Sequence, residues 1–183
     1  GGEILFRGRD ILRMAPEELR EILGPAISAI FQEPMTALSP LKTVGDQLRE
    51  LLDLHRPELT RTEKEETVVD WLDKVGIPDP AARRKEYPFQ YSGGMRQRVT
   101  IAMALMLEPD LVIADEPTTA LDVTLQAQVF DLMMRMKADN TSLIFITHDM
   151  GVVWELCDRV LVMKNARLVE EGSAEPLFRD PRE

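Results

Sequence analysis

Short, uniformly apolar runs alternate along this chain with longer stretches whose apolar residues recur at helical spacing. The apolar runs at residues 26–31, 111–114 and 142–147 are typical of strands buried on both faces of a parallel sheet. Helical spacing follows at residues 92–106, 123–137 and 150–157, and further short strands are predicted at 3–6, 159–163 and 167–169. This alternation predicts an α/β fold with a doubly wound, mostly parallel sheet and right-handed crossovers.

Between residues 35 and 90 the pattern changes to helices and turns without strands. One apolar stripe comprises Val44, Leu48, Leu51 and Leu52, and a second comprises Val68, Leu72 and Val75. The tetrapeptide from Thr60 to Glu63 fits a capping box at the start of the second helix. We therefore expect this segment to consist of helices joined by turns.

Polar residues directly follow three of the predicted strands. Gln32 ends the first, the pair Asp115 and Glu116 ends the second, and His148 ends the third. Any one of them alone is usually an ordinary strand end. Because the carboxyl ends of parallel strands meet at one edge of a sheet, their repetition predicts a shared site.

A helix start near this site has the features of an anion-binding end. Ser92 is a suitable N-cap residue, and Gly93 and Gly94 expose backbone amides at the positive end of the helix dipole. Together with the carboxylates, this helix start favours a phosphate site.

The segments YSGGMRQR (91–98), LVIADEPTTALD (111–122) and ITHD (146–149) resemble conserved motifs of ABC-type ATPases. They are similar, in order, to the signature motif, the Walker B strand with the D-loop, and the H-loop, and most of all to those of oligopeptide and dipeptide importers. The resemblance implies an ABC-type P-loop NTPase fold with a helical lobe. It divides the chain into residues 1–32, the core up to the Q-loop, residues 33–91, the helical lobe, and residues 92–183, the rest of the core.

The resemblance also implies roles for the residues at the strand ends, with ATP and Mg²⁺ as cofactors. Glu116 would orient or deprotonate the attacking water, and His148 would contact the γ-phosphate. Asp115 would hold Mg²⁺ through water, and Gln32 would reach both the metal and the attacking water.

A second group of residues would act on the nucleotide that is bound by an opposing subunit. These residues are Ser92, Gly93, Gly94 and the D-loop residue Asp122, which lies with Ala120 and Leu121 at the seam between subunits. The implied partners are a second ATP-binding subunit, the same or different, transmembrane permease subunits and, indirectly, a solute-binding protein. The implied location is peripheral, on the cytoplasmic face of the cell membrane.

The composition excludes several other functions and agrees with the one that the motifs imply. The net charge of −10 argues against a nucleic-acid surface, which needs clustered basic residues. Cys157 is the only cysteine, so no internal disulfide can form. No apolar run is long enough to span a bilayer, so membrane association would depend on partners.

One expected motif is missing. None of the ten glycines is followed by lysine, so the sequence has no G-x-x-x-x-G-K-[ST] loop to hold the β- and γ-phosphates. We expect the chain to be a piece of a longer subunit that lacks the P-loop strand and helix and is inactive alone. The alternative is a non-catalytic binding or assembly module that cannot bind ATP by itself.

Two other members of the superfamily fit less well. A chromosome-maintenance ATPase would carry a long coiled coil between the Q-loop and the signature motif, but only 60 residues separate Gln32 from Ser92, without sustained heptads. A translation-factor relative would show tandem copies, and the chain has no internal repeat.

Overall fold

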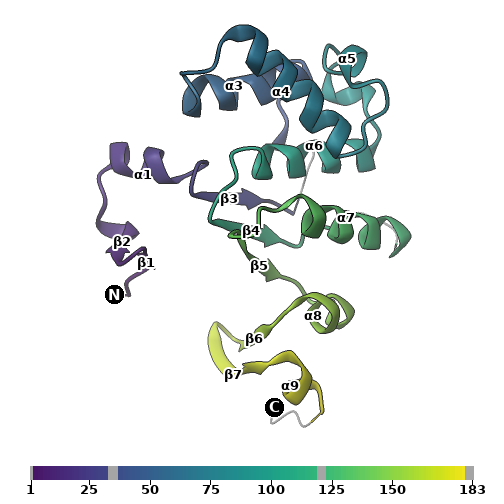
Figure 1. The fold of residues 1–183 in the computed structure, drawn as a ribbon. Coiled ribbons are helices and arrows are strands. Elements are labelled where there is room, and N and C mark those ends of the chain that lie inside the picture. The colour runs from purple at the N-terminus through teal and green to yellow at the C-terminus, as the bar shows by residue number, and fades with distance from the viewer. Residues whose placement is uncertain (1, 33–36, 119–122, 180–183) are drawn as a thin grey trace. The chain divides into compact units, whose positions relative to one another are not determined.

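The computed structural model describes residues 2–32, 37–118 and 123–179. The chain divides into two compact units, Gly1–Phe145 and Ile146–Glu183, and each is described by itself. Figure 1 shows the elements in chain order, from the N-terminal hairpin through the helices of the first unit to the C-terminal hairpin and helix.

A three-stranded sheet positions the candidate site. It comprises β3 (Ile27–Ile30), β4 (Leu111–Asp115) and β5 (Ser142–Ile146), in the order β3-β4-β5. Strands β3 and β4 are parallel, with Ile30 opposite Ala114. The predicted parallel pairing of these two strands is confirmed, and all of the helical segment lies in the crossover between them.

The first strands form a small hairpin of their own. β1 (Leu5–Phe6) pairs antiparallel with β2 (Arg9–Asp10), and the turn residues Arg7 and Gly8 both have positive φ. A 3₁₀ turn (Ile11–Arg13) and the helix α1 (Pro16–Ile22) lead from this hairpin to β3. The proline at the start of α1 costs no hydrogen bond, because the first amides of a helix have no partner within it.

The segment after β3 consists of α3 (Val44–His55), α4 (Arg61–Lys74), the short α5 (Pro80–Arg83) and a 3₁₀ turn (Pro88–Gln90). The capping box predicted for α4 is confirmed. The Thr60 hydroxyl accepts from the amide of Glu63 at 3.3 Å, and the Glu63 carboxylate accepts from the amide of Thr60 at 2.7 Å. The Thr60 hydroxyl also donates to the Glu63 carboxylate at 2.7 Å. This hydrogen bond, and after it the one from the Thr60 amide, lowers the pKa of Glu63.

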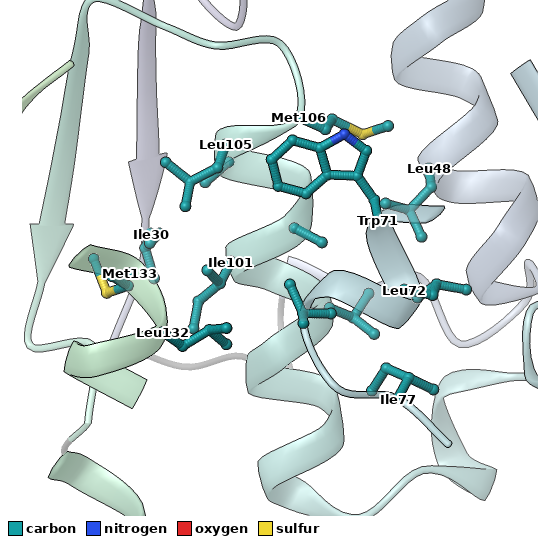
Figure 2. Close-up of a cluster of buried hydrophobic side chains, with 14 of the residues drawn as sticks. Ile30, Leu48, Trp71, Leu72, Ile77, Ile101, Leu105, Met106, Leu132 and Met133 are labelled. Carbon is teal, nitrogen blue, oxygen red and sulfur yellow. The ribbon is translucent and has the colours of Figure 1, made fainter. Parts of the chain in front are cut away.

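One hydrophobic cluster runs from these helices into the sheet. Its residues come from α3, α4, α6 (Gly93–Leu105), α7 (Val123–Met136), β3 and β4, and from the segments that follow α4 and α6. Figure 2 shows part of this cluster. The labelled members are Ile30, Leu48, Trp71, Leu72, Ile77, Ile101, Leu105, Met106, Leu132 and Met133. Every residue of the two predicted apolar stripes is buried except Leu51, which is partly buried and packs against the cluster. The amphipathic pattern therefore identified the inward faces of α3 and α4 correctly.

The prediction that residues 142–147 form a strand buried on both faces is wrong. Leu143 and Phe145 pack against the core. The ring of Phe145 contacts that of Phe130 on α7 edge to face, with 5.7 Å between the ring centroids. On the opposite side, Ile144 is 48% exposed and Ile146 is 50% exposed, because no described element covers them. Sequence periodicity shows which strand residues are apolar but does not show which neighbours cover them.

Of the three methionines near the end of α7, one lies outside the core. Met133 is fully buried and Met136 packs at the edge of the cluster, whereas Met134 lies on the exposed side of the helix.

The second unit contains α8 (Met150–Leu156), β6 (Arg159–Lys164), β7 (Arg167–Ser173) and α9 (Ala174–Arg179). The last two strands do not extend a parallel sheet as predicted, because they pair antiparallel with each other. Only Asn165 and Ala166 connect them, and both have positive φ. Two residues can join antiparallel strands but cannot make the crossover that parallel strands require.

Candidate functional site

Two of the predicted site residues meet at the carboxyl ends of paired strands. The side-chain amide Nε2 of Gln32 donates to Oε2 of Glu116 at 2.9 Å, although the residues are 84 positions apart. The strand register explains this contact. Ile30 and Ala114 are direct partners in the parallel ladder, and Gln32 and Glu116 each follow two residues later.

The backbone changes direction where the second carboxylate begins. Asp115 is the last residue of β4 and its side chain is exposed, whereas Glu116 has a left-handed backbone with φ of 42°. A left-handed conformation is uncommon for a residue with a side chain and costs roughly 1–2 kcal/mol.

The start of α6 has the predicted cap. The Ser92 hydroxyl accepts from the amide of Met95 at 3.2 Å. Among the described residues, a Cβ at Gly93 or Gly94 would meet no atom within 4 Å other than its chain neighbours and the backbone of its own helix, and neither glycine has a positive φ. The fold of this chain therefore does not require glycine at either position, and both backbones are open to a close approach from outside.

Tyr91 fixes this helix start to the preceding segment. Its ring is buried, and its hydroxyl donates to the backbone carbonyl of Arg83 at 2.8 Å. Burial, with a smaller contribution from the Glu86 carboxylate, raises the pKa of Tyr91 to about 12. The phenol is therefore neutral at physiological pH and serves as an anchor.

Arg98 is a connecting residue that the sequence did not reveal. From α6, its Nη1 donates to the carbonyl oxygen of Val75 at the end of α4, at 2.9 Å. Its Nη2 donates to Oε1 of Gln128 on α7, at 3.2 Å. A basic residue in an otherwise amphipathic helix gives no local sign of partners 23 and 30 positions away.

His148 and the D-loop residues complete the predicted set but are not placed with it. His148 belongs to the second unit, where Asp149 caps α8 by accepting from the amides of Gly151 and Val152. Asp122, with Ala120 and Leu121, lies outside the described residues. The position of His148 beside the Gln32–Glu116 pair therefore stays a prediction.

Metal binding by this arrangement would use oxygen atoms. Across residues 2–32, 37–118 and 123–179, no group of three or more histidine, cysteine or acidic side chains is arranged to hold a metal ion. Mg²⁺ is commonly held in proteins by one or two carboxylates together with water and phosphate oxygens. The exposed carboxylate of Asp115, next to Glu116, fits that smaller requirement.

None of the described helices combines the length and the apolar character that a membrane span requires.

The chain belongs to the ABC transporter family, whose profile matches residues 1–119. It is 51% identical to the dipeptide transport ATP-binding protein DppD of Bacillus subtilis over 182 residues, which are 99% of this chain and 54% of that protein. It is 49% identical to the oligopeptide transport ATP-binding protein AmiE of Streptococcus pneumoniae, covering 99% of this chain and 51% of that protein. The chain thus spans about half the length of the curated relatives it matches.

Solved structures of ATP-binding cassettes have the same fold. The dimeric cassette MJ0796, in a post-hydrolysis state with ADP and Pi, matches with a TM-score of 0.81 and 26% identity over 95% of this chain and 74% of that one. The structure of cbiO1 from Clostridium perfringens, part of the transporter complex cbiONQ, gives a TM-score of 0.79 and 28% identity over 98% of this chain and 69% of that one. These likenesses confirm the predicted fold class.

Proposed function

We propose that this chain is part of an ATP-binding subunit that couples MgATP hydrolysis to the import of peptides. The observation that carries the proposal is the contact between Gln32 and Glu116 at the ends of two paired parallel strands. Ligands of open α/β sheets bind at this edge, and a carboxylate beside an amide there can hold and activate a water molecule. The relatives named as peptide transport ATP-binding proteins support the choice of solute.

In the proposed mechanism Glu116 accepts a hydrogen bond from the attacking water and draws its proton away as the oxygen approaches phosphorus. Gln32 holds the Glu116 carboxylate in one orientation through the 2.9 Å hydrogen bond. Asp115 would hold Mg²⁺ through water, and the ion, when bound, neutralises charge that develops on the phosphate oxygens. His148 would contact the γ-phosphate.

A second copy or a related subunit would complete the site. The open backbones of Gly93 and Gly94 and the Ser92 cap support a role in which this helix start grips a nucleotide held by the opposing subunit. Asp122 would lie at the same seam. The dimeric state of the cassette MJ0796 supports such an arrangement.

Permease subunits would dock on the helical segment, residues 33–91. Supporting this, an open groove of about 450 Å³ lies between α4 and α5, with Val69 and Pro80 among its lining residues. Glu66 and Asp73 also line the groove, and both are exposed. Within the described residues, neither forms an ion pair. Charge reversal at Glu66 and Asp73 should reduce transport more than basal hydrolysis in a reconstituted transporter, and equal losses would count against docking here.

The direct test of the chemistry compares three variants of the complete subunit. Glu116→Gln keeps size and hydrogen bonding but removes the base, so hydrolysis should fall by roughly 10²–10⁴-fold while MgATP still binds. Asp115→Asn should weaken binding of MgATP more than binding of ATP measured without the metal. Glu108→Gln, which alters a carboxylate near the end of α6, should leave both unchanged.

The proposal fails if Glu116→Gln hydrolyses ATP at the wild-type rate. The alternative, a module that does not bind nucleotide, predicts that a fluorescent ATP analogue binds none of the three proteins.

A further inference from the structure

A pocket of about 320 Å³ lies between α3 and α4, apart from the candidate site at the sheet edge. Its lining residues are Arg49 and Asp53 of α3 and Arg61 and Lys64 of α4. The two helices pack against each other within the first unit, at the top of Figure 1. Three cationic side chains and one carboxylate thus line the pocket.

Lys64 is the innermost of these cations. It is only 7% exposed, and its ammonium donates to Oδ1 of Asp53 at 2.9 Å. An ammonium group carries three N–H donors. Asp53 is its one recorded acceptor within the described residues, so the remaining donors of a nearly buried charge require water or a ligand.

The two arginines also have donors to spare. Arg49 binds Asp46 at 2.7 Å outside the pocket, and its Nε lies 3.9 Å from Asp53. Arg61 is 84% exposed in its side chain and donates from Nε to Glu65 at 3.2 Å, which leaves its terminal nitrogens available. Exposed pairs of this kind contribute little stability, so a better acceptor can draw the guanidinium groups inward.

The position on the helix adds to the attraction. Arg61 and Lys64 lie in the first turn of α4, where the helix dipole favours negative charge. The cap of this helix is already made by Thr60 and Glu63 on its own backbone, so the side chains that line the pocket are not used for capping.

We propose that this pocket binds a phosphate group. Inorganic phosphate and phosphate monoesters are close to doubly charged near neutral pH and present three acceptor oxygens. The phosphodiester of a phospholipid headgroup carries one charge and presents two such oxygens. Both can engage the ammonium and guanidinium groups that arrive from two helices. Asp53 is the built-in competitor, because its carboxylate occupies part of the space that the anion would use. The phosphate belongs either to a small soluble molecule or to the headgroup of an acidic phospholipid.

The proposal is independent of ATP hydrolysis, because none of the lining residues belongs to the sheet-edge site. The net charge of −10 makes general attraction of anions by the whole protein unfavourable. Specific binding of phosphate must therefore come from a local arrangement of cations.

The test measures binding of inorganic phosphate to the purified chain at constant ionic strength, with chloride as the exchanged anion. Backbone amide NMR shifts report where the anion binds. The amide signals of residues 49–64 should shift when phosphate is added to the wild-type protein. Arg61→Ala should weaken the affinity about tenfold through loss of one charge-assisted contact. Asp53→Asn should strengthen it, because the competing carboxylate is removed.

Arg135→Ala is the matched control. Like Arg61, Arg135 is an exposed arginine that forms an ion pair with a carboxylate four positions away on the same helix, in this case Asp131 on α7. Its replacement should leave phosphate binding unchanged. Circular dichroism verifies that each variant is folded.

Vesicles distinguish the two sources. Binding to phosphatidylglycerol but not phosphatidylcholine vesicles, competed by inorganic phosphate and weakened by Arg61→Ala, identifies a headgroup, whereas binding of free phosphate alone identifies a soluble ligand. Either result supports the pocket. The proposal would be overturned if Arg61→Ala and Arg135→Ala changed the phosphate affinity equally, or if Asp53→Asn bound phosphate more weakly. It would also be overturned if phosphate shifted only the amide signals of Gly93 and Gly94.

Discussion

Replacing Arg98 with alanine should destabilise the first unit by removing its connection between three helices. The variant loses the partly buried, charge-assisted hydrogen bond to the Val75 carbonyl at 2.9 Å and the exposed one to Gln128 at 3.2 Å. The first is worth about 1.5–3 kcal/mol and the second about 0.5 kcal/mol, because water replaces it readily. We therefore expect the free energy of unfolding to fall by about 2–3.5 kcal/mol.

Gly76 offers an independent way to disturb the same contact. It has φ of 74°, and an added Cβ would lie 2.9 Å from Nη1 of Arg98. Gly76→Ala should therefore cost about 1 kcal/mol for the left-handed backbone and an additional amount for displacing the guanidinium. In the Arg98→Ala background only the backbone term remains, so the two substitutions should be less than additive by about 0.5 kcal/mol or more.

Urea denaturation followed by tryptophan fluorescence measures these differences. Of the two tryptophans, Trp71 is buried in the first unit and Trp154 is half exposed in the second, so a Trp154→Phe background reports on the first unit alone. Arg135→Ala is again the control and should change the free energy of unfolding by less than about 0.5 kcal/mol. A loss in Arg98→Ala no larger than that in the control would refute the inference that Arg98 joins these helices.

Three further substitutions test other parts of the first unit. Leu48→Ala should cost about 3 kcal/mol in the free energy of unfolding, since Leu48 is fully buried, and a cost below about 1 kcal/mol would contradict the core assignment. Tyr91→Phe should cost about 1 kcal/mol at neutral pH. Because the pKa of Tyr91 is raised from 10.0 to about 12, the wild type should also lose stability as the pH rises through that range, a loss that Tyr91→Phe should lack in urea titrations. The pKa of Glu63 is lowered from its ordinary value of 4.5, so this carboxylate stabilises the fold above about pH 4.5, and that stability is lost as the pH falls. Glu63→Gln should therefore reduce the dependence of the free energy of unfolding on pH on the acid side. An unchanged dependence would argue that the capping box does not lower the pKa.

The sequence predicted the features that local chemistry determines. The apolar stripes of α3 and α4 and the caps at Thr60 and Ser92 depend on spacing within a few residues, and the structure confirms them. The ends of the strands could also be predicted, because a polar residue directly follows each apolar run. From the parallel pairing alone, Gln32 and Glu116 were expected at one edge of the sheet.

Features that depend on distant neighbours could not be predicted in this way. The exposure of Ile144 depends on what covers that face of β5, which the strand's own pattern does not contain. Arg98 acquires its role only when Val75 and Gln128 come together around it. The antiparallel hairpin of β6 and β7 was different, because the short connection at Asn165 and Ala166 was visible in the sequence and excluded a parallel crossover.

Size-exclusion chromatography of the complete Glu116→Gln subunit, with and without MgATP, tests the central claim most directly. Without the base, the nucleotide should remain unhydrolysed between Ser92, Gly93 and Gly94 of one copy and the phosphate-binding residues of the other. We predict a dimer that forms only with MgATP, and none from the 183-residue chain carrying the same substitution, because this chain contains no G-x-x-x-x-G-K-[ST] loop. A complete Glu116→Gln subunit that stays monomeric with MgATP while hydrolysing it at the wild-type rate would contradict the role assigned to Glu116. A MgATP-dependent dimer of the 183-residue chain would contradict the claim that it cannot hold nucleotide alone.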